Sequence, residues 1–213
     1  MKLREIFRYE VGYRLHSPST WVYAGFLVLV AFWMFLATAD EGASALANAP
    51  ERLAGGSVLP GMFGMLVTAA LFGDAAVRDI RFGMDPLVYT VPLGKAEHLG
   101  GRFLGALAVN AIVLLAIPLG VFVATWFGRS FEAMGPFRLA AHVQPFFVFL
   151  LPNLVVVGAI LFAIGMLARR VLPVYLGAIG IFIGYIVALN YAGGIESPML
   201  ASLVDPLGLV SLQ

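Results

Sequence analysis

Residues 78–102 read RDIRFGMDPLVYTVPLGKAEHLGGR, which is the longest polar stretch in a very apolar chain. The stretch lies between two long hydrophobic runs, and Pro86 and Pro92 exclude one continuous helix through it. It holds four of the thirteen basic residues of the chain: Arg78, Arg81, Lys95 and Arg102. We therefore interpret 78–102 as a structured loop that joins two membrane spans.

Composition assigns the class. The chain is 61% hydrophobic and 12% charged, against roughly 25% charged in a soluble domain, and its mean hydropathy is +0.95. A soluble fold has nowhere to place so much apolar surface. A net charge of +1 without a basic run predicts no nucleic-acid partner, and the absence of cysteine excludes disulfides and thiolate chemistry. The expected protein is an all-α integral membrane protein with a single domain over 1–213.

Five apolar runs are long enough to cross a hydrocarbon core of about 30 Å. They cover about 21–38, 58–77, 103–127, 143–168 and 171–192, and Pro118 is expected to kink the third. Residues 39–57 are predicted to be a connection. Residues 193–213 are predicted to be an external or re-entrant segment, because the apolar part is short and is interrupted by Asp205-Pro206.

The first sixteen residues predict an amphipathic helix in the membrane interface. Leu3, Ile6, Phe7, Val11 and Leu15 share one side of it, and Glu10 and Arg14 have the favourable i,i+4 order. Ser17-Pro18 is expected to end the helix. The alternatives are a frayed basic tail, or a signal peptide cleaved near Ala37-Thr38-Ala39, although the apolar run is longer than a usual signal sequence.

Basic residues predict the orientation. With the N-terminus inside, ten of the thirteen lie in segments on the inner side, and only Arg52, Arg129 and Arg138 lie outside. This bias follows the positive-inside rule. The segment 78–102 is then a cytoplasmic loop.

Motifs for chemistry within this chain are missing from the sequence. Gly94-Lys95 is followed by Ala96, so it is no P-loop, and neither H-E-x-x-H nor G-x-S-x-G occurs. Asp74 precedes Arg78 by four residues, which favours structural pairing over a proton relay. Asn110, Asn153, Asn190 and Gln144 are open to two interpretations, which are a polar path and hydrogen bonds between helices.

Two small-residue pairs predict close helix packing. They are Gly101 with Gly105 and Gly180 with Gly184. Whether either pair lies in a subunit interface is left open.

Several segments together resemble the membrane part of an ABC-2-type transporter permease, in a bacterial branch whose longer members carry an M1-type aminopeptidase domain. The similar segments are FRYEVGYRLHSPSTWVY at 7–23, FGDAAVRDIRFGMDPLVYTVPLGKAEHLGGRFLGAL at 72–107, GPFRLAAH at 135–142, LLPNLVVVGAILFAIGMLARR at 150–170 and LVDPLGL at 203–209. Each motif is short, and their order and spacing carry the resemblance over essentially the whole chain.

The resemblance implies the membrane subunit of an exporter in the bacterial inner membrane, with its N-terminus cytoplasmic. A second permease half would pair with it, and a separate cytoplasmic ATPase would bind ATP and Mg²⁺, so this chain is expected to hold no cofactor and no catalytic site. Residues 1–18 would form the elbow helix, and a coupling helix at about Asp85–Thr90 would receive the ATPase. Such halves usually have six spans and this chain shows five, so the sequence is expected to be the front part of a longer protein or a truncated one.

The residues of the loop fit that role. Asp85 can cap a short helix that Pro86 opens, and Pro92 ends it. The expected ATPase contact consists of Arg81, Asp85, Pro86, Leu87, Val88, Tyr89 and Lys95, with the apolar residues as a plug and the two basic residues steering an acidic surface. The alternative is that the plug lies on the bilayer interface. At the level of function, the alternatives are an autonomous carrier or channel and a membrane anchor protein; the substrate is not readable.

Overall fold

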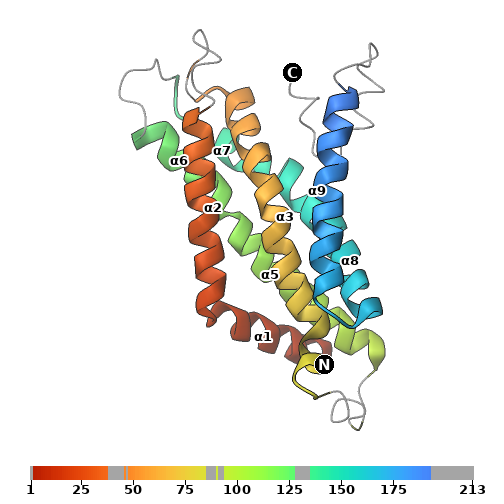
Figure 1. Ribbon diagram of the computed structural model, residues 1–213. Helices are drawn as coiled ribbons and strands as arrows, with labels where there is room; N and C mark the ends of the chain where they lie inside the picture. Colours follow the sequence, from red (N-terminus) through yellow and green to blue (C-terminus); the bar gives the residue numbers. More distant parts are fainter. Residues whose placement is uncertain are drawn as a thin grey trace.

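The computed structural model describes residues 2–37, 46, 48–84, 90, 94–127 and 135–192, with side chains up to Val187. This part of the chain is helical and contains no β-strand (Figure 1). Its elements are α1 (Lys2–Leu15), α2 (Pro18–Ala37), α3 (Pro50–Arg81), α5 (Lys95–Leu114), α6 (Ala116–Phe127), α7 (Leu139–Pro145), the π-helical turn η2 (Phe146–Leu150), α8 (Leu151–Ala168) and α9 (Leu172–Ala192). The predicted all-α class is confirmed.

Four helical stretches are long and apolar enough to cross a membrane: Pro18–Ala37, Pro50–Arg81, Lys95–Phe127 and Leu139–Ala168. This is the pattern of a multi-pass membrane protein. The helix α9 is also apolar and packs against α3 and α8. Its portion with described side chains, Leu172–Val187, is shorter than the four spans, so a fifth crossing stays a prediction, as does the placement of residues 193–213, which lie outside the described residues.

Helix α3 lies at the centre of the bundle and packs against α2, α5, α8 and α9 (Figure 1). Two thirds of its apolar window are buried, against about a fifth for α2. The fully buried ring of Phe72 lies 5.4 Å from the ring of Phe103 and 6.4 Å from that of Phe162, measured between centroids. These aromatic contacts join α3, α5 and α8 into one core.

The predicted connection over 39–57 is wrong for its last eight residues. Helix α3 begins at Pro50, a residue that is well suited to the first turn because its missing N–H has no helical partner there. Leu53 is fully buried, and a Cβ at Gly56 would lie 2.4 Å from the ring of Phe35. The small residues that lower the local hydropathy thus belong to a tight contact between α2 and α3.

The predicted loop over 78–102 is wrong at both ends. Helix α3 continues to Arg81, and α5 begins at Lys95, eight residues before the predicted span. Glu97 accepts a hydrogen bond from the Gly94 N–H and so caps the start of α5. Within these helical ends, Arg78 forms an ion pair with Glu10 of α1, and Asp79 forms one with Arg102 of α5.

Prolines mark the irregular points of the two following spans. The third span is interrupted at Leu115, between α5 and α6, three residues before Pro118. Pro118 cannot donate a hydrogen bond to the carbonyl four residues earlier, which is why a kink is expected here. In the fourth span, a π-helical turn separates Pro145 from Pro152. That span is helical from Leu139, earlier than the predicted start at 143.

The helix α1 lies across the lower end of the bundle (Figure 1). It ends at Leu15, just before Pro18 opens α2, as the sequence predicts. Its most buried residues are Glu10 and Arg14, whereas Leu3 is exposed and Ile6 is half-buried. Two charged residues of α1 therefore face the bundle, and part of its apolar side packs against the bundle as well.

Candidate functional site

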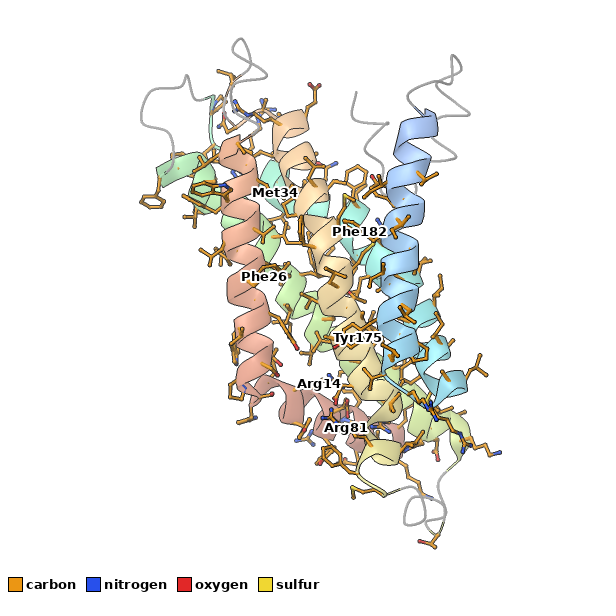
Figure 2. The ribbon with its side chains drawn as sticks, in the orientation of Figure 1. Arg14, Phe26, Met34, Arg81, Tyr175 and Phe182 are labelled. Carbon is orange, nitrogen blue, oxygen red and sulfur yellow. The ribbon has the colours of Figure 1, made fainter. Side chains whose placement is uncertain are left out.

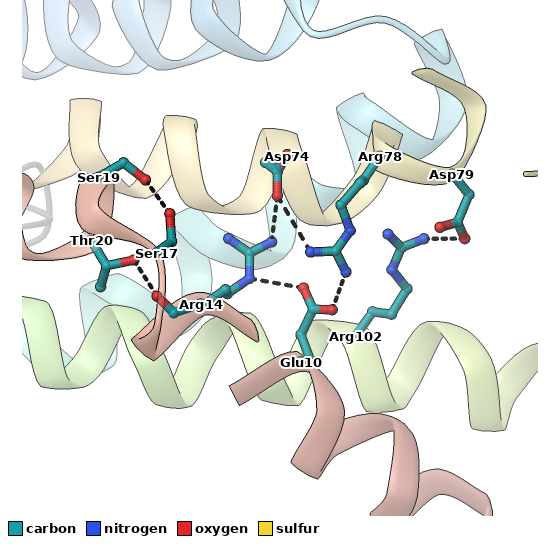
Figure 3. A network of polar contacts seen from close by, with 9 residues as sticks. All are labelled: Glu10, Arg14, Ser17, Ser19, Thr20, Asp74, Arg78, Asp79 and Arg102. Atoms are coloured by element: carbon teal, nitrogen blue, oxygen red, sulfur yellow. Dashed lines mark hydrogen bonds and ion pairs between the residues drawn. The ribbon is translucent and has the colours of Figure 1, made fainter. Parts of the chain in front are cut away.

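The candidate site is a closed ring of four charged side chains where α1 meets α3 (Figure 3). Glu10 accepts hydrogen bonds from the Arg14 Nε, at 2.8 Å, and from the Arg78 guanidinium. The Asp74 carboxylate accepts a hydrogen bond from Arg14 at 3.0 Å and lies 3.7 Å from Arg78 Nη1. Negative and positive groups alternate around the ring, so its formal charge is zero.

Each helix contributes an acid followed four residues later by an arginine. Glu10 and Arg14 form such a pair on α1, and Asp74 forms one with Arg78 on α3. This spacing brings the two side chains together on one helix face. The structural pairing of Asp74 that the sequence favours is thus observed, and its second partner, Arg14, comes from α1.

The ring is buried. Glu10 is 1% exposed, Arg14 3% and Arg78 9%. Buried charges are tolerated when each has a partner, and removal of one partner from such a pair costs about 3–5 kcal/mol because the other charge is left uncompensated. The Arg78 guanidinium also lies 4.4 Å from the centre of the Tyr13 ring, a cation–π contact that ties α3 to α1 a second time.

A second ion pair connects α3 to α5. The Asp79 carboxylate contacts Arg102 and lies 3.2 Å from His98 Nε2. Arg102 is buried, so its charge also depends on this partner. The two helices that flank residues 82–94 are therefore joined directly at their ends.

Helix α1 rests on the glycines of α5. A Cβ at Gly101 would lie 2.8 Å from Ile6 Cγ2, and one at Gly105 would lie 2.6 Å from Glu10 Cβ. Only glycine permits so close an approach at these two positions. Gly101 and Gly105 thus contact the N-terminal helix, whereas no described atom comes within 4 Å of a Cβ at Gly180 or Gly184.

The structure describes two of the residues expected to contact an ATPase. Arg81 ends α3 and Lys95 begins α5, and both are exposed at the end of the bundle that carries α1. The other five lie outside the described residues: Asp85, Pro86, Leu87, Val88 and Tyr89. The structure therefore describes the two basic residues that flank the expected contact and not the five residues between them.

Sequence reasoning missed the ring as a unit. It recognised the pair on α1 and the pair on α3 separately, and it gave Asp79 and Arg102 no partners. A usable signal was present, because two pairs with the same acid-then-arginine order each adjoin an apolar run. Two acids and two arginines are the equal numbers of negative and positive groups that a closed ring of alternating charges requires.

The structure describes the side chains of three of the four polar residues within the spans. Asn110 is fully buried and donates a hydrogen bond to Thr68 Oγ1 at 2.8 Å, which links α5 to α3. Thr68 and Asn153 line a cavity of about 30 Å³, roughly the volume of one water molecule. Gln144 lines a separate pocket beside Pro50, and the side chain of Asn190 is outside the described residues.

No three His, Asp or Glu side chains of the described residues are grouped so that they could hold a metal ion. Comparison of the sequence with models of known protein families and with curated proteins finds no match. The resemblance to ABC-2-type permeases therefore rests on the quoted motifs. The arrangement joins α1, the end of α3 and the start of α5 by ion pairs at one end of a bundle of apolar helices.

Proposed function

We propose that the chain is a membrane-spanning permease subunit of an ABC-type exporter, with ATP hydrolysed by a separate cytoplasmic ATPase. The observation that carries the proposal is the paired network that joins α1, the end of α3 and the start of α5. Helices α3 and α5 flank residues 82–94 in the sequence, and α1 is paired with α3 and packed on α5. A loop that receives a push from a soluble partner needs such a base, because a loose base would absorb the movement.

In this proposal the helices transmit the push of the ATPase from the loop into the membrane. Helix α3 is the central element and contacts α2, α5, α8 and α9. A displacement of its end, together with the start of α5, would therefore reach most of the bundle through packed side chains. In this proposal α1 is the elbow helix, and the ring holds it to α3 while the glycines of α5 hold it from the other side.

Charge supports the proposed orientation. Arg81 and Lys95 flank the loop at the end that carries α1, and the exposed Arg169 and Arg170 lie between α8 and α9. In the proposed topology these residues face the cytoplasm, in agreement with the positive-inside rule. The same end would face the ATPase and its acidic surface. The proposed location is the inner membrane of a bacterium.

A second permease half completes the proposal. Exporters of this kind place the substrate path between two halves. The exposed Gly180 and Gly184 side of α9 is the proposed contact with that half, since glycines allow close approach between membrane helices.

The test is to identify what binds the chain. An affinity-tagged chain is purified from its native membranes in mild detergent, beside an unrelated tagged multi-pass protein as control. We expect a P-loop ATPase, encoded in a neighbouring reading frame, in near-stoichiometric amount with the chain and not with the control. If no ATPase is enriched over the control, and none is encoded nearby, the proposal is wrong.

A further inference from the structure

A pocket of about 220 Å³ opens beside the ring, between α1, the start of α2, the end of α3 and the start of α9. Its wall combines charged and hydroxyl groups with apolar side chains. The polar part includes Arg14, Asp74, Arg81, Tyr13, Tyr23 and Tyr175, together with Ser17, Ser19 and Thr20. Figure 2 shows Arg14 on α1, Arg81 on α3 and Tyr175 on α9 near one another.

The charge of the pocket is positive. Arg14 and Asp74 belong to the neutral ring, so the guanidinium of Arg81 is the surplus charge. Arg81 makes no ion pair with any residue that the structure describes; its guanidinium lies 5.9 Å from the Phe82 ring. The exposed Arg169 and Arg170 directly precede Val171, which lines the same pocket. An anion is therefore the ligand that this charge favours.

Arg14 supplies a second donor. Its side chain is 4% exposed, and its Nε and Nη2 are engaged by Glu10 and Asp74. The remaining nitrogen has no partner among the described residues and lies on the side of Ser17 and Thr20 (Figure 3). This buried guanidinium is held in place by the ring while one of its N–H groups stays available to the pocket.

The apolar part of the wall points to a lipid. Ala70 and Leu71 line the pocket from α3, about three helical turns before Arg81, and Val171 lines it from the start of α9. Eleven residues of helix span about 16 Å, close to half of the hydrocarbon core. The three tyrosines have the amphipathic rings that favour the level of lipid headgroups. Within these eleven residues Asp74 also lines the pocket, so Ala70 and Leu71 form an apolar end on the side away from Arg81. A free phosphate makes no use of an apolar end.

We propose that this pocket binds the phosphate headgroup of an anionic phospholipid. The phosphate lies between Arg81 and the free N–H of Arg14, with tyrosine hydroxyls as further donors, and an acyl chain follows Ala70 and Leu71. The pocket is smaller than sites for drug-sized ligands, so it takes the headgroup and leaves the second chain in the bilayer. The bound lipid fills the angle between α1, α3 and α9. This inference does not depend on the proposed function.

The test uses the full chain, purified in detergent and stripped of lipid, without any ATPase. Phosphatidylglycerol, phosphatidylcholine and inorganic phosphate are titrated separately, and binding is followed by the shift of the thermal unfolding midpoint and by native mass spectrometry. We expect phosphatidylglycerol to raise the midpoint and to remain bound, and the other two to do neither. Equal effects of the two lipids, or displacement of phosphatidylglycerol by millimolar phosphate, would overturn the proposal.

Variants locate the site. Arg81→Gln should weaken phosphatidylglycerol binding about fivefold, the effect of one basic residue near an anionic headgroup. Arg138→Gln removes an exposed arginine at the opposite end of the bundle and should leave binding unchanged. Ser19→Cys gives the cysteine-free chain one thiol in the pocket, and phosphatidylglycerol should slow its alkylation. If Arg81→Gln binds like Arg138→Gln, or if the lipid leaves the thiol unprotected, the lipid binds elsewhere.

Discussion

The Arg78 guanidinium on α3 donates a hydrogen bond to the Glu10 carboxylate on α1, although the two residues are 68 positions apart and both are buried. The contact fixes the N-terminal helix against the last turns of the central helix. Because Arg14 and Asp74 complete the ring, neither helix has to bury an uncompensated charge. Charge pairing with α3 and close packing on the glycines of α5 thus together hold α1 in place.

The first prediction concerns the coupling between these two residues. Glu10→Gln and Arg78→Gln should each lower the free energy of unfolding by about 3–5 kcal/mol, since each leaves buried charge unpaired. The double variant should lose less than the sum, because both members of the pair are then neutral. Thermal unfolding in detergent measures all three, with Glu5→Gln as a control on the exposed side of α1. Additive losses would mean that the two side chains do not interact.

The second prediction concerns the contact of α1 with α5. Gly105→Leu should lower the free energy of unfolding by about 2–3 kcal/mol, because a Cβ there meets Glu10 at 2.6 Å and the helices must separate. Gly12→Leu is the matched control on α1, where no described atom lies within 4 Å of a Cβ. It should be neutral or stabilising, since leucine favours the helix over glycine. Equal effects of the two changes would argue against this packing.

Hydropathy was sufficient to predict the helical class and most of the apolar stretches, because a membrane span must be apolar and of a certain length. It failed at the ends of α3 and α5. Arg78, Asp79 and Arg102 were assigned to a loop since charges are costly in apolar surroundings, yet each has a partner from another helix. Arg102 and Asp79 are 23 positions apart, and Arg78 and Glu10 are 68 positions apart. Ion pairs between residues so distant in the sequence cannot be recognised from the neighbouring residues.

The ion pairs within each helix of the candidate site were predictable from the sequence, and the contacts between the two helices were not. The i,i+4 spacing identified Glu10 with Arg14, and Asp74 with Arg78. Their meeting depends on the angle at which α1 crosses under α3, and that angle depends on Gly101 and Gly105. Glycine is frequent in membrane helices, so spacing alone could not indicate which helix these two residues contact.

The third prediction is the topology. The chain has no cysteine, so Ser44→Cys, Ala96→Cys and Ser197→Cys each introduce one thiol without background. With the N-terminus inside and five crossings, a membrane-impermeant thiol reagent added to intact cells should label the variants at 44 and 197 and leave the one at 96 unlabelled. Permeabilised cells serve as the control for reactivity. Labelling at 96 in intact cells would reverse the orientation.

The fourth prediction tests the second permease half. Gly180→Leu with Gly184→Leu should abolish cross-linking between two halves in the membrane while leaving thermal unfolding of the single chain unchanged, because no described atom lies near either Cβ. Gly25→Leu is a matched control, since its Cβ position on α2 is also open. Persistence of the cross-linked pair in the glycine variant would exclude this side of α9 from the interface.

The most direct measurement of the central claim is the ATPase activity that co-purifies with loop variants. Leu87→Asp and Tyr89→Ala should each abolish retention of the ATPase and its stimulated turnover, while the chain keeps its thermal unfolding midpoint. Leu46→Asp makes the same kind of change at an exposed leucine near the opposite end of the bundle and should retain both. If the ATPase and its activity survive both loop changes, residues 82–94 are not the proposed ATPase contact.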